Sequence, residues 1–496
     1  MKHVFYLLIL LIGLSANVSA EKVYDFNATC QQAYGEITKL KIAQGTLLLN
    51  EAKKQNPDNL IPYMLEGYID FFELFLNEDP KQYNERKDNF SKRQHAYDNG
   101  PQNSPFYRYC LAVNLLQRAT VRIKFGERFG AVFDFKKGYS LIKENQKKYP
   151  TFLPNNLVYG PLQVAMGTVP DGYKIYTSLF GMKGSIKEGM QLMRSFLNSN
   201  DYMAKLLHNE AVFYYAYLSF YIENKPEDVI QFIKDKKLDM VNNYLFAYLG
   251  TNLGINSKNA LFAKSVMDNR NTSPAYLATP VWDFEMAYAK LYHLELPEAV
   301  ISFNNFLDNF KGRFYVKDAL LKLSWCYYLQ GDSIKAELTR QRVLKQGSTD
   351  SDADKKALRD AKSGMWPDKT LLRARLLSDG GYHNEALAIL TSKSKSQFTT
   401  STDQLEYVYR MARINDDLGK DSEAIQWYSS AMKLGRGMRE YYAARASLQI
   451  GYIYEKRGQK ALAKSYFQQC IDMDDHEYKD SLDQRAKSGI ARCNGE

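Results

Sequence analysis

The stretch ASLQIGYIYEKRGQKALAKSYFQQCIDMDD, residues 446–475, decides the fold. Tyr454 follows Gly451 by three positions and Ala463 follows it by twelve, and Phe467 and Cys470 come four and seven positions after that alanine. Small residues at this spacing let two antiparallel helices approach closely, and the aromatic rings fill the space beside the crossing. The stretch therefore predicts a helical hairpin, and we interpret Cys470 as a buried packing residue rather than a reactive thiol.

The same spacing recurs in four stretches upstream, residues 284–307, 320–338, 371–390 and 404–432. Five such units in tandem resemble the tetratricopeptide repeat and predict an all-α fold, an α-α superhelix of stacked hairpins. Their starts are separated by more than the usual period of about 34 residues, so we expect an irregular superhelix. The positions that carry the pattern are Ala287, Ala299, Phe303, Ser324, Tyr327, Ala336, Ala374, Ala386, Ala412, Ala424, Tyr428 and Ala431.

Four regions follow from these patterns. Residues 1–20 form a targeting segment, 21–200 an irregular helical region, 201–276 connecting hairpins and 277–496 the repeats.

Asn200 or Asp201 is expected to cap one long helix over 202–224. The polar segment 345–360 predicts a flexible connection, and its acids at 352 and 354 are interpreted as solvated.

The first twenty residues have the pattern of a secretory signal peptide. Lys2 precedes the apolar run 4–14, which is too short for a comfortable membrane span, and Val18-Ser19-Ala20 offers small residues before a cut at Glu21. Cys30 lacks the small apolar residues that precede a lipoprotein cysteine. We therefore expect an exported protein, periplasmic or envelope-associated, with no transmembrane segment in the mature chain.

The charge balance argues against nucleic acid as a partner. The chain has 66 basic and 56 acidic residues, a formal net charge of +10, and both signs are scattered along it. Nucleic-acid binders usually concentrate their positive charge on one face. We interpret the excess as solvated helix faces, with weak association to an anionic envelope surface left open.

Neither a catalytic nor a metal site is predicted. The five cysteines are widely spread and form no C-x-x-C pair, and the histidines never fall at ligand spacing. The chain contains no H-E-x-x-H, no G-x-S-x-G and no dinucleotide fingerprint after a strand. The sequence thus predicts a protein that is not an enzyme and has no cofactor.

The glycine-rich stretch 167–191 invites comparison with a phosphate-binding loop. Such a loop needs G-x-x-x-x-G-K-[ST] after a strand, but Ser185 follows Gly184, Lys183 precedes it, and no strand signal comes before. Pro170-Asp171-Gly172 favours a turn, and the glycines permit a bend into the next helix. We interpret the stretch as a joint between helical blocks, with Gly181 and Gly184 as backbone hinges.

The block PLQVAMGTVPDGYKIYTSLFGMKGSIKEGMQLMRSF, residues 161–196, resembles the inclusion body clearance family, the tetratricopeptide-repeat-39-like proteins. The layout of residues 108–142 is also similar to that family. The chain departs from the family in its signal peptide and in lacking the fuller Ser-Leu-Leu-Pro stretch before the bend. The resemblance implies a helical-repeat scaffold and brings no catalytic residue with it. The positions that match are Pro170, Phe180, Gly181, Gly184 and Gly189.

These patterns favour an exported scaffold that binds a protein or peptide in its concave groove. The alternative is a glycan-binding envelope protein, for which 37 tyrosines would supply stacking faces. In such a superhelix the first helix of each hairpin lines the groove. Each aromatic residue on that face has a second interpretation as packing between repeats. The predicted groove residues are Trp325, Tyr328, Arg375, Tyr409, Arg413, Arg445 and Tyr452.

Overall fold

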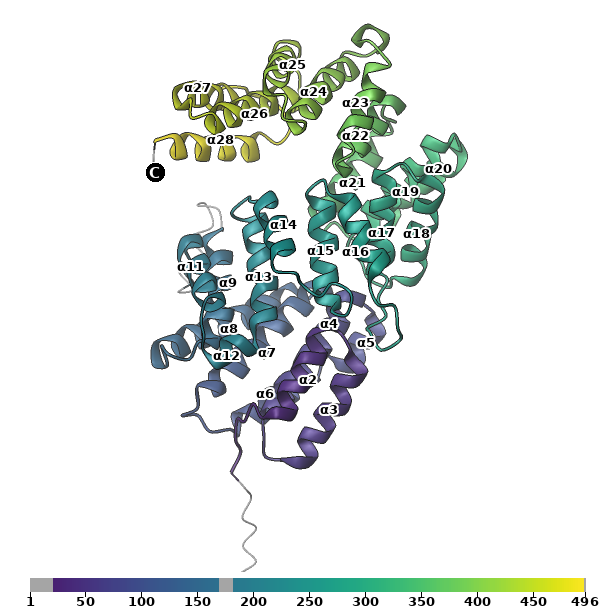
Figure 1. Cartoon of the computed structure of the whole chain (residues 1–496). Helices are drawn as coiled ribbons and strands as arrows, with labels where there is room; N and C mark the ends of the chain where they lie inside the picture. The colour runs from purple at the N-terminus through teal and green to yellow at the C-terminus, as the bar shows by residue number, and fades with distance from the viewer. Residues whose placement is uncertain (1–20, 169–181, 495–496) are drawn as a thin grey trace, which may run out of the picture. The chain divides into compact units, whose positions relative to one another are not determined.

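The computed structural model describes residues 21–168 and 182–494. These residues form helices joined by short loops, with one isolated parallel β-bridge between Val23 and Asn59 and no strand among them (Figure 1). The predicted all-α class is confirmed. The predicted leader, residues 1–20, lies outside the described residues, as do Pro170, Phe180 and Gly181.

The chain packs into two compact units. Unit 1 runs to Leu253 and adds Val266–Val281 and Asp308–Arg313. Unit 2 comprises Gly254–Ser265, Trp282–Leu307 and the chain from Phe314 onward. The units thus interleave along the sequence, whereas the predicted regions are contiguous, and the predicted boundaries after residues 200 and 276 stay predictions.

Unit 1 consists of helices that pack mainly as antiparallel neighbours. Its hairpins pair α2 with α3, α7 with α8, α9 with α11 and α13 with α14. Within this unit the helices are α2 (Ala28–Thr38), α3 (Ile42–Gln55), α4 (Ile61–Asn77), α5 (Pro80–Arg86), α6 (Asn89–Asp98), α7 (Pro105–Lys124), α8 (Arg128–Lys148), α9 (Pro154–Gly167), α11 (Ile186–Leu197), α12 (Tyr202–Leu206), α13 (His208–Tyr221) and α14 (Pro226–Asp235), followed by α15 (Tyr244–Asn256) and α16 (Ala260–Asn269), which unit 2 shares.

Glycines bring α9 and α11 into close contact. A Cβ on Gly189 would lie 2.5 Å from the carbonyl oxygen of Gly160, and one on Gly184 would lie 2.3 Å from that of Gln163. Gly184 is not among the glycines with positive φ. Positive φ therefore does not explain the glycine at 184, whereas close backbone packing does, and its interpretation as a hinge stays a prediction.

The segment 202–224 is not one helix. Asp201 caps α12, since its Oδ1 accepts the backbone N–H groups of Met203 at 2.8 Å and Ala204 at 3.2 Å. The helix then ends after five residues and α13 begins at His208. Glu210 in the first turn of α13 accepts the hydroxyl of Tyr34 at 2.8 Å inside the core of unit 1. The prediction of one long helix is therefore wrong, although the predicted cap at Asp201 is confirmed.

Unit 2 is a row of hairpins, each a first and a second helix in antiparallel contact (Figure 1). The pairs are α17 (Val281–Tyr292) with α18 (Leu296–Asn309), α19 (Val316–Gln330) with α20 (Ser333–Lys345), α22 (Lys369–Gly380) with α23 (His383–Thr391), α24 (Ser401–Asp417) with α25 (Asp421–Leu434), and α26 (Tyr442–Lys456) with α27 (Lys460–Ile471), followed by α28 (Lys479–Asn494). A 3-10 turn, η1 (Lys395–Gln397), precedes α24.

The small and aromatic positions predicted from the spacing occupy the core of these hairpins. Phe467 is fully buried, and a Cβ on Gly451 would lie 2.5 Å from its ring. Cys470 is a buried free thiol, and burial raises its pKa to about 12, so its role as packing is confirmed. The positions that are completely buried are Ala287, Ala299, Phe303, Ser324, Ala336, Ala374, Ala386, Ala412, Ala424, Tyr428, Ala431 and Ala463.

An additional helix, α21 (Asp352–Ser363), stands between the second and third hairpins. Asp354 is fully buried and its carboxylate accepts the backbone N–H groups of Tyr315 at 2.8 Å and Asp318 at 3.1 Å. This carboxylate therefore binds the start of α19, where helical N–H groups lack partners. The prediction of a flexible connection over 345–360 is wrong, because Ser351 caps a helix there. Of the two acids expected to be solvated, Asp352 is 98% exposed, as predicted, whereas Asp354 faces inward.

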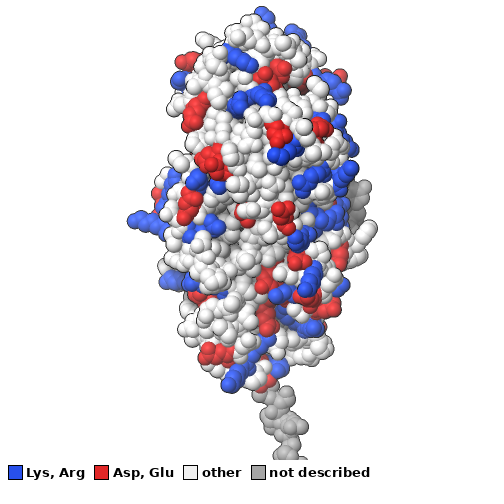
Figure 2. Space-filling view, turned by 90° about the vertical axis from the view of Figure 1, so that its right-hand side faces the viewer, with Lys and Arg blue, Asp and Glu red and all other residues white. Residues whose placement is uncertain are grey.

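Charged residues of both signs are interspersed on the face of the molecule drawn in Figure 2. This agrees with the interpretation of the positive excess as solvated helix faces. Within residues 21–168 and 182–494, no helix is long and apolar enough to cross a membrane.

Candidate functional site

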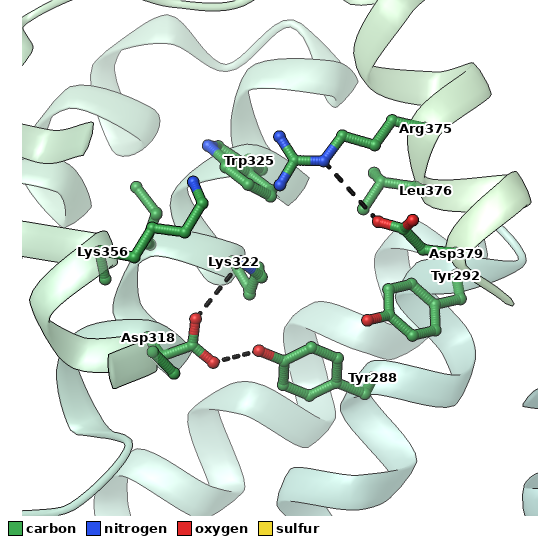
Figure 3. Close-up of a pocket in the computed structure, with 12 residues that line it drawn as sticks. Tyr288, Tyr292, Asp318, Lys322, Trp325, Lys356, Arg375, Leu376 and Asp379 are labelled. Carbon is green, nitrogen blue, oxygen red and sulfur yellow. Dashed lines mark hydrogen bonds and ion pairs between the residues drawn. The ribbon is translucent and has the colours of Figure 1, made fainter. Parts of the chain in front are cut away.

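A pocket of about 200 Å³ lies within unit 2, among the first helices of three hairpins and the additional helix α21 (Figure 3). Two of the predicted groove residues, Trp325 and Arg375, line it together. The other lining residues are Tyr288 and Tyr292 of α17, Asp318, Leu321 and Lys322 of α19, Ala353, Lys356 and Ala357 of α21, and Leu376 and Asp379 of α22.

One wall of the pocket is formed by three polar side chains of α17 and α19 that bond to one another. The hydroxyl of Tyr288 donates to Oδ2 of Asp318, and Nζ of Lys322 lies 3.3 Å from Oδ1 of the same carboxylate. The side chains of Asp318 and Lys322 are only 7% and 12% exposed. Both oxygens of Asp318 are therefore occupied, and this wall offers little free bonding capacity.

The opposite wall presents an arginine with donors to spare. Nε of Arg375 lies 3.7 Å from Asp379, and its guanidinium carbon lies 5.1 Å from the ring centroid of Trp325. Trp325 is 4% exposed and also contacts Nζ of Lys322, 4.1 Å from its ring centroid. Trp325 thus positions two cations, and among the described residues neither Nη of Arg375 has a hydrogen-bond partner.

Helix α21 supplies a third cation to the pocket, Lys356. Its ammonium pairs with Asp360 at 2.5 Å. Burial, followed by the positive charges of Arg375 and Lys322, lowers the pKa of Lys356 to about 8. A group that is already crowded by like charges gains most from an incoming anion or carbonyl oxygen.

Tyr292 completes the pocket. Its hydroxyl points into the space between Asp379 and Asp318 in Figure 3, with no hydrogen bond drawn to it among the residues shown. The pocket therefore combines an aromatic wall, an arginine with free donors and a tyrosine hydroxyl. Such a mixture suits a polar side chain or the backbone of a bound segment.

Two predicted groove residues on α24 pack inside the unit. Tyr409 is 4% exposed, and its ring lies 4.9 Å from that of Tyr442. Arg413 pairs with Asp416 and Asp417, each at 3.4 Å. Packing between repeats, the second interpretation of the aromatic residues, accounts for Tyr409, whereas the ion pairs of Arg413 lie within α24 itself. We leave both residues out of the proposed contact set.

The last predicted pair lies on α26, against α28. Tyr452 packs edge-on against Phe467 at 5.4 Å, and the guanidinium of Arg492 lies 5.9 Å from its ring centroid. The buried Nε of Arg445 has no hydrogen-bond partner among the described residues. Burial and the charge of Arg445 lower the pKa of Arg485 on α28. The two arginines therefore lie close enough to repel each other, and within residues 21–168 and 182–494 neither forms an ion pair with an acidic side chain.

Tyr328 of α19 faces the loop after α21. Its ring stacks on Trp366 at 4.6 Å and its hydroxyl donates to the carbonyl oxygen of Pro367 at 3.1 Å. The seven predicted residues therefore fall into four places, and the first-helix spacing brings only Trp325 and Arg375 into one pocket. The lining residues that sequence reasoning missed include Lys356, because the segment that carries it was expected to be flexible.

We use the name first-helix face of unit 2 for a set of residues on the first helices α17, α19, α22 and α26 and on helix α21; of these, Tyr328, Arg445 and Tyr452 do not line the pocket. Within residues 21–168 and 182–494, no group of three or more His, Cys, Asp or Glu residues could hold a metal ion. The first-helix face consists of Tyr288, Tyr292, Lys322, Trp325, Tyr328, Lys356, Arg375, Asp379, Arg445 and Tyr452.

Comparison with known protein families identifies one repeat directly. Residues 444–477 match the family described as tetratricopeptide repeat. This range contains α26 and α27, whose spacing predicted the hairpin. The chain therefore contains a tetratricopeptide repeat, and its resemblance to the inclusion body clearance family stays a prediction.

Three solved structures are similar over most of the chain. The TPR domain of P58(IPK) is 15% identical, over 86% of this chain and 96% of that one, with a TM-score of 0.23. The Cut9-Hcn1 hetero-tetramer of APC/C is 11% identical, over 92% of this chain and 95% of that one, with a TM-score of 0.26. Yeast Tom70 is 14% identical, over 91% of this chain and 97% of that one, with a TM-score of 0.24. Whole chains do not superpose at such scores, so the repeat assignment rests on residues 444–477 and the hairpin packing. Comparison with curated protein sequences gives no match.

Proposed function

We propose that this protein is an exported, non-enzymatic scaffold whose first-helix face in unit 2 binds a segment of a partner polypeptide. The observation that carries the proposal is Arg375, which is held over Trp325 while both of its Nη groups lack partners among the described residues. A guanidinium with free donors binds a carboxylate or carbonyl oxygen in two-point geometry.

The chemistry of the face suits a peptide better than a glycan. Trp325 is buried beneath two cations, and Tyr328 is already stacked on Trp366, so neither ring face is open to a sugar. Arginines and aromatic residues in partly buried positions also contribute most of the energy in protein interfaces. Retention of the protein on a polysaccharide column would favour the glycan alternative.

The proposal is tested by removing the free donors without changing the fold. Arg375→Gln and Arg445→Gln should each lower the amount of partner that co-purifies from the native host, with the melting temperature within a few degrees of the parent. Lys335→Gln is the matched control, because Lys335 is 64% exposed on the second helix α20. Equal recovery of partner with all three variants would count against this face.

Export rests on the leader pattern, and we propose cleavage before Glu21. The intact mass of the protein purified from its native host should lack residues 1–20. A mass that includes them, or recovery in the cytosolic fraction, would exclude export.

A further inference from the structure

The start of helix α8 exposes large apolar side chains on its outer side. Phe129 is 88% exposed, Phe133 72% and Val132 58%. Spacings of three and four residues place all three on one face of the helix. Because α8 buries its other face through Ala131 and Tyr139, these side chains contribute nothing to the core of unit 1. We call Phe129, Val132 and Phe133 the α8 outer patch.

Positive charge borders this patch. Arg128, Lys136 and Lys137 each lie four residues from a member of the patch and therefore on the same side of the helix. Asp134, the acidic residue between Arg128 and Lys137, is 5% exposed and faces inward. There it pairs with Arg118 at 2.6 Å and Arg122 at 2.5 Å, both on α7. The outer side of α8 is thus apolar at its start and basic around it.

We propose that the α8 outer patch binds the surface of an anionic lipid bilayer. The two phenylalanines and the valine would enter the boundary between head groups and acyl chains, while the three cations meet lipid phosphates. A helix with aromatic residues on one side and flanking lysines or arginines has the composition that favours this position at a membrane. This function is separate from partner binding by unit 2 and does not rest on it.

Other occupants fit the patch less well. A second copy of the chain would bring Arg128, Lys136 and Lys137 against their own counterparts, and like charges repel. A stable protein partner usually covers about 20 to 30 residues on each side. The patch offers three apolar side chains on a single stretch of helix, which suits insertion into lipid better than a protein interface.

Vesicle flotation with the full chain tests the proposal. We expect binding to phosphatidylcholine vesicles that contain phosphatidylglycerol, weaker binding to pure phosphatidylcholine, and loss in 1 M salt, where charge screening is strongest. Phe129→Ser with Phe133→Ser should weaken binding by about tenfold or more. The matched control is Ile334→Ser with Leu338→Ser, a pair with the same spacing on α20 that is 76% and 63% exposed.

A second variant keeps the test informative if the double change disturbs folding. Phe129→Trp should show a blue shift of its fluorescence when phosphatidylglycerol vesicles are added, beyond any shift of the parent protein. Absent binding by the parent, unchanged binding after loss of both phenylalanines, or equal loss in the α20 control would overturn the proposal. A parent dimer that becomes a monomer in the Phe129→Ser, Phe133→Ser variant would instead assign the patch to self-association.

Discussion

Gly451→Ala tests the packing that defines the repeat. The new Cβ would lie 2.5 Å from two carbons of the Phe467 ring, which is fully buried and also approaches Gly489 from its other side. Forcing a methyl group into a filled core costs about 1–3 kcal/mol. Replacing glycine by alanine within a helix returns about 0.8–1.0 kcal/mol. We therefore expect a net destabilisation of up to about 2 kcal/mol.

Hydrogen exchange in α26 and α27, followed by mass spectrometry in increasing denaturant, measures this loss where it occurs, because repeat proteins open locally. Gly35→Ala is the control for helix propensity, since nothing lies within 4 Å of its added Cβ, and it should stabilise α2. Phe467→Leu should partly offset Gly451→Ala, giving less than additive losses. A Gly451→Ala protein more stable than the parent by about 0.8–1.0 kcal/mol, the full gain in helix propensity, would refute the packing argument.

Three further changes follow from particular contacts. Gly381→Ala should destabilise unit 2 more than Gly419→Ala in thermal melts. Both glycines have positive φ, but only the Cβ at 381 would meet a carbonyl oxygen, that of Lys258 at 1.9 Å. Equal losses of stability in the two variants would exclude that clash. Asp354→Ala should cost about 1–3 kcal/mol in denaturant unfolding, because it leaves the N–H groups of Tyr315 and Asp318 at the start of α19 without their acceptor, and a neutral effect would contradict the cap. At pH 8 we expect Lys356, with a pKa of about 8, to be acetylated faster than Lys335, whose pKa is raised by Asp332. This order is expected although Lys335 is the more exposed of the two, and equal acetylation rates would contradict the lowered pKa of Lys356. The unfolded chain binds more protons at Lys356 above pH 8, so the contribution of this residue to stability rises with pH there.

The repeat hairpins could be predicted because their packing depends on residue size at fixed spacing. Gly451, Ala463 and Phe467 are close in sequence, so the pattern contains the contact that they make. Helix α21 could not be predicted from its polar composition, since its inward face depends on Asp354 binding backbone groups more than thirty residues earlier. Lys356 escaped prediction for the same reason.

The glycine-rich stretch shows a second limit. A glycine required for positive φ and one required for close packing look alike in a sequence. Gly184 belongs to the second kind, because the carbonyl of Gln163 occupies the place of its missing Cβ. In the same way, spacing placed Tyr409 on the first helix correctly but could not separate an open aromatic side chain from one covered by Tyr442.

Site-specific photo-crosslinking in the native host tests the central claim most directly. A benzophenone side chain placed at Tyr452, on the first-helix face, leaves the guanidinium of Arg375 in place and should form a covalent adduct with a partner polypeptide. The same group at Ile334 or Leu338, exposed on the second helix α20, should form none. Adducts from the α20 positions alone, or equally from both sets, would contradict the account.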